Sequence, residues 1–593
     1  MNLFLSRRTM LALSGAAILA PGAARAQPAS EADAAFDALA ADAIKAFARL
    51  NPTYATQLGD HDFDAWLDDL SPQGYDARAT FARETLTALN AIPAGELDRE
   101  RQVDAAMLRS SLEGQIWTYE TLRDWTWDPL THNGVAGGSL YNLIARDYAP
   151  ASQRLMAAAS RMERFPALFA GTRASLQPDR VPSIHAQTYV NQNRGVLGLI
   201  DLLMSQAEGL SEAETARLTA AATVAREAIN SHQAWIEQTL LPSAQADFRI
   251  GAELYDRKLQ YALNSPLDRA AIRQKAETAM ETITAEMYGL AQGVLAGRAD
   301  APALPASPSR EERRAAIAAA LELAYAERPA RDQVVPLARE TLETTTAFVR
   351  AHDLVSVPDD PVQIIQMPEF QRGVAVAYCD SPGPLDRGQD TFYAVSPIPD
   401  DWTEEQVASF LREYNTRSIH ELTIHEAMPG HYLQIAHSNR HPSVLRAVLS
   451  SGPFVEGWAC YVQDVMDEAG YMDRDPLYRL VHLKWQLRMI ANAILDQAIH
   501  VDGMTREAAM ELMMRDAFQE EREAAGKWVR AQLSSTQLPT YFVGWDEHWS
   551  LRREVEAREG AAFNLKAYHD RALSFGSPPV RYTRALMLGE QVA

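Results

Sequence analysis

The sequence predicts a mostly α-helical fold, and two observations support this prediction. Long stretches place apolar residues at i, i+3, i+4 and i+7, with charged residues on the opposite face. Ala, Leu, Glu and Arg, which favour helices, dominate these stretches. With 593 residues, 47% of them apolar and 23% charged, the chain is long enough to bury a large core. We therefore expect one large helical domain.

The predicted helices alternate with short breaks. The clearest helical stretches span residues 31–50, 77–92, 212–240 and 267–297. Breaks that contain proline span residues 50–64, 127–139, 298–312 and 356–364. Proline ends helices because it lacks a backbone N–H and its ring clashes with the preceding turn.

One segment predicts strands instead of helices. Residues 372–397 contain two runs of β-branched and aromatic residues on either side of a segment rich in glycine and proline, a pattern typical of a β-hairpin. An edge strand there would hold an extended peptide by backbone pairing, with Tyr378 as the candidate substrate-binding side chain. The alternative is a hairpin that only caps the helical bundle.

The N-terminus predicts a cleaved export signal of the twin-arginine type over residues 1–26. Arg7 and Arg8 precede a short apolar run, and Ala26 ends a small-residue cleavage pattern. The run from Met10 to Ala24 is shorter than the roughly 20 residues that a membrane helix needs, and it contains Pro21. We therefore expect a periplasmic protein without a stable membrane anchor.

Charge and cysteine content exclude further classes of function. The formal net charge of −22 would repel phosphate backbones, so nucleic acid is not expected as a partner. The two cysteines, Cys379 and Cys460, are too few for a disulfide framework or a cysteine-based zinc site. They either pair in the periplasm or are two small buried side chains.

The most informative motif is His-Glu-Ala-Met-Pro-Gly-His, from His425 to His431. Residues six apart on a continuous helix point about 120° away from each other, so these two imidazoles could not share an ion there. Pro429 interrupts the helix, and Gly430 can adopt backbone angles closed to other residues. A break at this point can turn His431 to face His425, with Pro429 as the first residue of the next helix.

Two acidic residues complete the candidate metal site. Glu426 follows the first histidine, as in His-Glu-x-x-His enzymes, where the glutamate takes a proton from water. Glu456 lies downstream among Phe454, Val455 and Trp458, and an acidic residue in such apolar company needs a cation or a proton. Catalytic zinc prefers three protein ligands, which predicts one zinc ion on His425, His431 and Glu456.

A polar stripe also runs along the predicted helix over residues 481–503. Its members recur every fourth residue and are Lys484, Arg488, Asn492, Asp496 and His500. Since the remaining positions are mostly apolar, the stripe faces either a wet cavity or solvent. Arg488 is a candidate for binding a peptide's terminal carboxylate; its alternative role is a structural pair with Asp496.

The chain resembles a bacterial family known as domain of unknown function 885. The resemblance covers residues from about Ala29 to Ala585 and is carried by the His425–His431 motif, by Glu-Gly-Trp-Ala-Cys-Tyr from Glu456, by residues 488–500 and by residues 51–72. That family resembles, in fold, the helical gluzincin metallopeptidases of the thimet oligopeptidase and angiotensin-converting-enzyme kind. The resemblance implies a deep channel, zinc binding by His425, His431 and Glu456, and Glu426 as the catalytic base.

The resemblance also implies further roles and a domain organisation. Gluzincin-like sites supply a Tyr or His that stabilises the oxyanion, and Tyr541 and His500 are the candidates here. Residues 27–593 would form one metallopeptidase-like domain, with an N-terminal helical half over about 27–355 and a catalytic half over about 356–593. The expected function is an exported zinc-dependent hydrolase acting on short peptides. The alternatives are a zinc hydrolase of non-peptide amides or esters, and a non-catalytic periplasmic binding protein.

Overall fold

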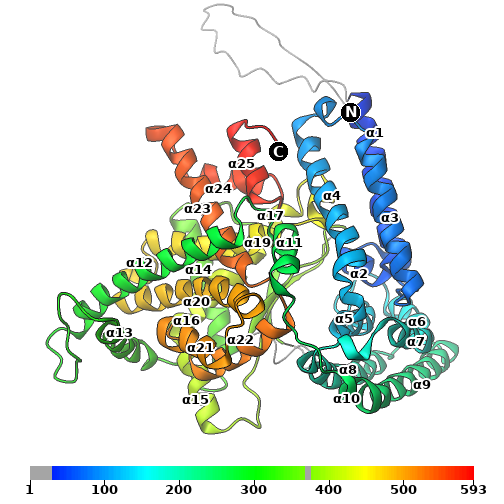
Figure 1. Cartoon of the computed structure of the whole chain (residues 1–593), viewed down its shortest axis with the longest axis horizontal. Helices are drawn as coiled ribbons and strands as arrows, with labels where there is room; N and C mark the ends of the chain where they lie inside the picture. The colour runs from blue at the N-terminus through cyan, green and yellow to red at the C-terminus, as the bar shows by residue number, and fades with distance from the viewer. Residues whose placement is uncertain (1–29, 368–375, 387, 593) are drawn as a thin grey trace, which may run out of the picture.

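A computed structural model describes residues 30–367, 376–386 and 388–592. Helices make up most of these residues, which confirms the predicted fold class (Figure 1). The predicted export signal lies outside the described residues. Within them, no helix combines the length and the apolar character that are needed to cross a bilayer.

The first group of helices, blue to cyan in Figure 1, packs on one side of the molecule. It comprises α1 (Glu31–Leu50), α2 (Pro52–Leu58), α3 (Pro72–Asn90), α4 (Arg99–Trp117), α5 (Pro129–Tyr141), α6 (Ala151–Met162), α7 (Phe165–Ser175), α8 (Ser183–Ser205), α9 (Glu212–Trp235) and α10 (Leu241–Ser243). Side-chain caps fix several starts: Ser30 and Ser211 each form a capping box with an acidic residue three positions later.

The next helices belong, by their packing, to the second half of the chain. They are α11 (Gly251–Leu263), α12 (Arg269–Leu295), α13 (Arg310–Tyr325) and α14 (Val334–Ala351). Their buried apolar residues share cores with residues after 362 and not with α1–α10. α11–α14 thus bury their apolar faces against the sheet and the C-terminal helices.

A three-stranded sheet follows α14, with the strand order β1-β3-β2. The strands are β1 (Val362–Gln366), β2 (Ala377–Asp380) and β3 (Thr391–Val395). β2 and β3 form the predicted antiparallel pair, with Ala377 opposite Val395; residues 372–375 and 387 of the predicted hairpin lie outside the described residues. β1 was not predicted from the sequence; it pairs parallel with β3.

The remaining helices build the larger side of the molecule. They are α15 (Glu404–Glu413), α16 (Thr416–Glu426), α17 (His431–Ser438), α18 (Val444–Val448), α19 (Gly452–Glu468), α20 (Pro476–His500), α21 (Arg506–Glu511), α22 (Glu521–Leu533), α23 (Pro539–Glu559), α24 (Leu565–Leu573) and α25 (Val580–Leu588). Short 3-10 and π-helical turns are η1 (His61–Phe63), η2 (Ala94–Glu96), η3 (Thr118–Leu122), η4 (Asp124–Thr126), η5 (Pro178–Arg180), η6 (Ile236–Leu240), η8 (Tyr471–Arg474), η9 (Leu512–Asp516) and η10 (Gly560–Ala562).

Two glycines let α19 and α23 cross at backbone contact. A Cβ atom on Gly457 would lie 2.3 Å from the carbonyl carbon of Gly544, and one on Gly544 would lie 1.9 Å from the oxygen of Pro453. No larger residue fits at either position without moving a helix. This crossing fixes the start of α23 beside the start of α19, where Glu456 lies.

Candidate metal centre

The break between α16 and α17 forms where the sequence predicts it. α16 ends at Glu426, the Met428–Pro429 peptide is cis, and α17 begins at His431. Pro429 is therefore not the first residue of α17, as was expected; Gly430 occupies the N-cap position. The break itself is as predicted.

Two contacts hold this break against its neighbours. A Cβ atom on Gly430 would lie 1.9 Å from the backbone oxygen of His425 and 2.3 Å from that of Ile424, so only glycine allows the approach. On the other side, the indole N–H of Trp458 donates to the backbone oxygen of Pro429 at 2.9 Å. The loop is therefore fixed to both α16 and α19.

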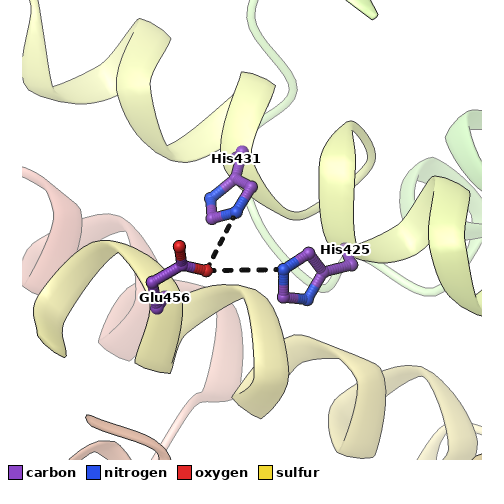
Figure 2. A group of neighbouring side chains, drawn as sticks. All are labelled: His425, His431 and Glu456. Atoms are coloured by element: carbon purple, nitrogen blue, oxygen red, sulfur yellow. Dashed lines mark ion pairs between the residues drawn. The ribbon is translucent and has the colours of Figure 1, made fainter. Parts of the chain in front are cut away.

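The break brings His425, His431 and Glu456 together (Figure 2). The Nε2 atoms of His425 and His431 lie 3.5 Å and 3.3 Å from Oε2 of Glu456. One ligand atom from each residue lies within 4.8 Å of the others. Ligands held tetrahedrally at 2.0–2.1 Å from zinc are about 3.3 Å apart, so the two nitrogen-to-oxygen distances match two edges of such a site.

Burial makes this cluster costly without a cation. His425 and His431 are 8% and 9% exposed, and Oε2 of Glu456 is buried without a hydrogen-bond partner among the described residues. Burial alone would raise the pKa of Glu456, but the two imidazoles hold it well below its usual range. Burial lowers the pKa of His431, but Glu456 and Glu426 together raise it. The donors therefore suit a bound cation.

Glu426 lies between this cluster and the sheet. It is the last residue of α16, is 9% exposed, and its charge acts on His431 in α17. The same charge raises the pKa of Cys379 in β2 and of Tyr393 in β3, although burial is the larger cause for both. The carboxylate is thus close to a predicted ligand without being one of the three converging groups.

The structure brings Tyr541, from α23, to the same cluster. Its ring centroid lies 6.4 Å from that of His425. Its hydroxyl oxygen accepts hydrogen bonds from Arg530 at 3.3 Å and from Gln537 at 3.4 Å. Burial and the Glu456 charge raise the pKa of Tyr541 to about 12, so it keeps its proton at neutral pH. Because both lone pairs have donors, the O–H is left to donate elsewhere.

Tyr378 lies in β2 and lines a large cavity. This cavity has a volume of about 1360 Å³ and extends between the N-terminal helices and the sheet. Its lining includes Tyr378 and Cys379 but none of the three converging residues. The Tyr378 hydroxyl interacts with Tyr141, and burial with the nearby Asp380 raises the pKa of Tyr378 to about 12. Both cysteines of the chain are free.

The polar stripe of α20 does not form a solvated outer face, because four of its side chains are buried and Arg488 is partly buried. Lys484 donates to Glu413 at 2.8 Å. Arg488 pairs with Glu523 at 2.6 Å, and not with Asp496 as in the structural alternative. Asp496 accepts from Tyr255 at 2.7 Å.

The structure does not bring His500 to the candidate metal centre. Its Nε2 atom lies 2.9 Å from the backbone oxygens of both Ala531 and Ser534, and its ring contacts Phe248 and Tyr255. These contacts give it a structural role at the end of α20. The oxyanion candidate that lies beside the cluster is Tyr541.

Three residues have roles that were not predicted from the sequence: Arg530 and Gln537 donate to the Tyr541 hydroxyl, and Trp458 donates to the helix break. No sequence motif marks Arg530, in α22, or Gln537, which precedes α23. Gly544, in the middle of an otherwise strong helical pattern, is a signal of close helix packing that could have located the crossing.

Comparison with known proteins identifies the family of this chain. Its structure is similar to that of a protein from Shewanella oneidensis described as a putative lipoprotein of unknown function, with a TM-score of 0.78, 33% identity, and coverage of 93% of this chain and 99% of that one. A second, described as a putative lipoprotein from Colwellia psychrerythraea, matches with a TM-score of 0.77 and 18% identity over 94% of this chain and 99% of its own. No curated protein matches. The model of the family described as "Bacterial protein of unknown function (DUF885)" matches residues 52–587, and the chain therefore belongs to this family.

Proposed function

We propose that this protein is a zinc-dependent hydrolase that cleaves short peptides. One observation carries the proposal: His425, His431 and Glu456, from three helices, converge, and the two distances from imidazole nitrogen to carboxylate oxygen suit tetrahedral zinc. Two imidazoles and one carboxylate form a ligand set typical of catalytic zinc, which keeps a fourth position for water or substrate. Zinc bound there would polarise the scissile carbonyl and lower the pKa of the attacking water.

Three groups of the chain have distinct roles in this proposal. Glu426 takes the proton from the attacking water and passes it to the leaving amine. The free O–H of Tyr541 donates to the oxygen that becomes negative as the carbonyl is attacked. β2 is an edge strand in the order β1-β3-β2, so its outer edge suits backbone pairing with an extended substrate. This edge favours peptides over isolated esters or small amides.

The proposal includes export from the cytoplasm. Arg7, Arg8 and the short apolar run that follows support secretion through a twin-arginine signal, with cleavage after Ala26. The description of both structural neighbours as putative lipoproteins agrees with a destination outside the cytoplasm. The substrates would then be peptides that reach the periplasm.

The test compares the purified wild type with Glu426→Gln, using zinc analysis and a panel of short peptides. We expect the variant to keep one zinc per chain and to lose activity by about 10²–10⁴-fold, the usual contribution of a general base. Glu405→Gln, at an exposed glutamate of α15, is the matched control and should behave like the wild type. Equal turnover by Glu426→Gln and wild type would remove Glu426 from the mechanism.

Metal removal supplies the second arm of this test. Chelation should abolish peptide hydrolysis, and zinc should restore it. A chelated protein that still cleaves peptides, or a zinc-loaded wild type that cleaves none of the panel, would contradict the proposal.

A further inference from the structure

Helix α22 places the basic side chains Lys527 and Arg530 close to Tyr541, although the chain as a whole is acidic. The chain has 78 acidic and 56 basic residues, so most arginines can find a carboxylate. Arg488 does so: its Nη2 atom lies 2.6 Å from Glu523. α22 also contacts α8, so this group lies where the two halves of the chain meet (Figure 1).

Arg530 differs from Arg488 because no carboxylate neutralises it. Its Nη2 atom donates to Gln537 at 2.8 Å and to the Tyr541 hydroxyl at 3.3 Å. Among the described residues, no carboxylate oxygen lies within the 4.0 Å that defines an ion pair. The side chain is only partly buried, so Nε and Nη1 remain as donors beside the candidate metal centre.

Lys527 adds a second basic side chain one helical turn before Arg530. It is 5% exposed, and its Nζ atom has no hydrogen-bond partner among the described residues. The nearest carboxylate oxygen, from Glu523, is 3.7 Å away and already pairs with Arg488. Burial and the Arg488 charge hold the pKa of Lys527 well below its usual range. Glu523 thus serves both Arg488 and Lys527, and Arg530 has no carboxylate within 4.0 Å among the described residues, so an anion would relieve the imbalance.

We propose that Arg530, supported by Lys527, binds a carboxylate group of the substrate close to the scissile bond. This inference rests on the proposed function and names the substrate class. Arg530 and His425 both contact the Tyr541 side chain, so the carboxylate would lie within a few residues of the bond that is cut. The carboxylate belongs either to a free C-terminus or to an acidic side chain. The guanidinium suits it because its remaining donors can form charge-assisted hydrogen bonds with a carboxylate.

The experiment measures binding, so it does not depend on turnover. Zinc-loaded Glu426→Gln would be titrated by calorimetry with three ligands: trialanine, trialanine amide, and Ala-Glu-Ala amide. We expect the amide without a carboxylate to bind at least about tenfold more weakly than a ligand with one. Preference for trialanine would identify the C-terminal carboxylate as the source, and preference for Ala-Glu-Ala amide the side chain.

Variants of α22 assign the preference to a residue. In the Glu426→Gln background, Arg530→Gln should reduce the ratio between acid and amide to about one, and Arg530→Lys should restore part of it. Arg522→Gln is the matched control, since Arg522 lies in the same helix over the Trp402 ring at 3.8 Å and should leave the ratio unchanged. Equal binding of all three ligands, or a ratio that survives Arg530→Gln in a folded protein, would overturn the inference.

The outcomes separate this inference from the proposed function. A carboxylate preference that depends on Arg530, in a protein whose wild type hydrolyses no peptide, would retain the binding site and reject the peptidase. Peptide hydrolysis by the wild type without any carboxylate preference would retain the peptidase and reject the role of Arg530.

Discussion

Two clusters of histidine and carboxylate side chains share helices α16 and α19. They differ in how many hydrogen bonds other protein groups donate to their carboxylates. The candidate metal centre uses His425 of α16 and Glu456 of α19. The second cluster uses Glu421 of α16 and Asp464 of α19, with His482 of α20 between them at 3.3 Å and 3.0 Å. Both clusters are built from the same kinds of side chain.

In the second cluster, protein groups donate to the carboxylate oxygens that face His482, whereas Oε1 of Glu421 has no hydrogen-bond partner among the described residues. Asp464 accepts from the indole N–H groups of Trp545 at 2.6 Å and Trp549 at 2.5 Å, and Glu421 accepts from Gln463 at 2.8 Å. In the metal centre, by contrast, Oε2 of Glu456 has no such donor among the described residues. Residue type alone therefore does not distinguish the two clusters; they differ in the Glu456 oxygen, which faces two imidazole nitrogens and has no such donor.

The largest expected effect is loss of the metal from one cluster only. His431→Ala removes one of three ligands, so zinc content should fall from one per chain to near zero, and hydrolysis with it. His437→Ala, in the same helix but bonded to the backbone oxygen of Ser356, should keep its zinc. Metal analysis after gel filtration measures both, and full zinc occupancy in His431→Ala would refute its assignment as a ligand.

A substitution in the second cluster should change the stability of the fold and leave the zinc content unchanged. His482→Ala leaves Glu421 and Asp464 buried without their shared cation, which should destabilise the fold by about 3–5 kcal/mol. Chemical denaturation measures this change, while the folded fraction should still bind one zinc. Zinc loss from folded His482→Ala would mean that the two clusters do not act separately.

A smaller effect is expected from the helix break that separates the two histidine ligands. Gly430→Ala puts a methyl group against the backbone oxygen of His425, so α16 and α17 must move apart, at a cost of about 1–3 kcal/mol and with weaker zinc binding. Gly289→Ala in α12, where a Cβ atom meets nothing within 4 Å, is the control and should not destabilise the protein. Unchanged zinc affinity in Gly430→Ala would show that the close approach is unnecessary.

The smallest expected effect is a change with pH in the free energy of unfolding, caused by the titration of His482 in the second cluster. Burial alone would lower the pKa of His482, but Glu421 and Asp464 raise it to about 10, from about 6.5 in the unfolded chain. Its stabilising contribution is therefore complete below about pH 6.5 and is lost as the pH rises through 10.

Denaturation of wild type and His482→Gln between pH 6 and 10 checks this sign. The difference in free energy of unfolding between the two proteins should shrink as the pH rises. A difference that stays constant would show that His482 is not charged in the folded protein.

The sequence predicted the converging side chains better than it predicted their surroundings. The approach of His431 to His425 follows from local helix geometry and from the Pro429-Gly430 break, which act within one short segment. Arg530 could not be predicted, because its place beside Tyr541 depends on how α22 and α23 pack against distant helices. For His500, the local pattern was misleading. Its position in a polar stripe was compatible with a cavity, but its Nε2 atom contacts the backbone oxygens of Ala531 and Ser534.

The fold was predictable at the level of helices and less so at the level of their grouping. The amphipathic pattern of α11–α14 is like that of α1–α9, so it does not reveal which half each helix joins. Strand β1 was missed because its five residues, Val362–Gln366, follow a proline-rich break and carry no hairpin partner next to them in sequence. Both depend on packing between residues far apart in the chain.

Anomalous diffraction from zinc-loaded crystals, measured at the zinc absorption edge, tests the central claim most directly. We expect one strong peak, about 2.0–2.2 Å from Nε2 of His425, Nε2 of His431 and a carboxylate oxygen of Glu456. A map with no peak there, or with zinc bound between Glu421, His482 and Asp464 instead, would contradict it.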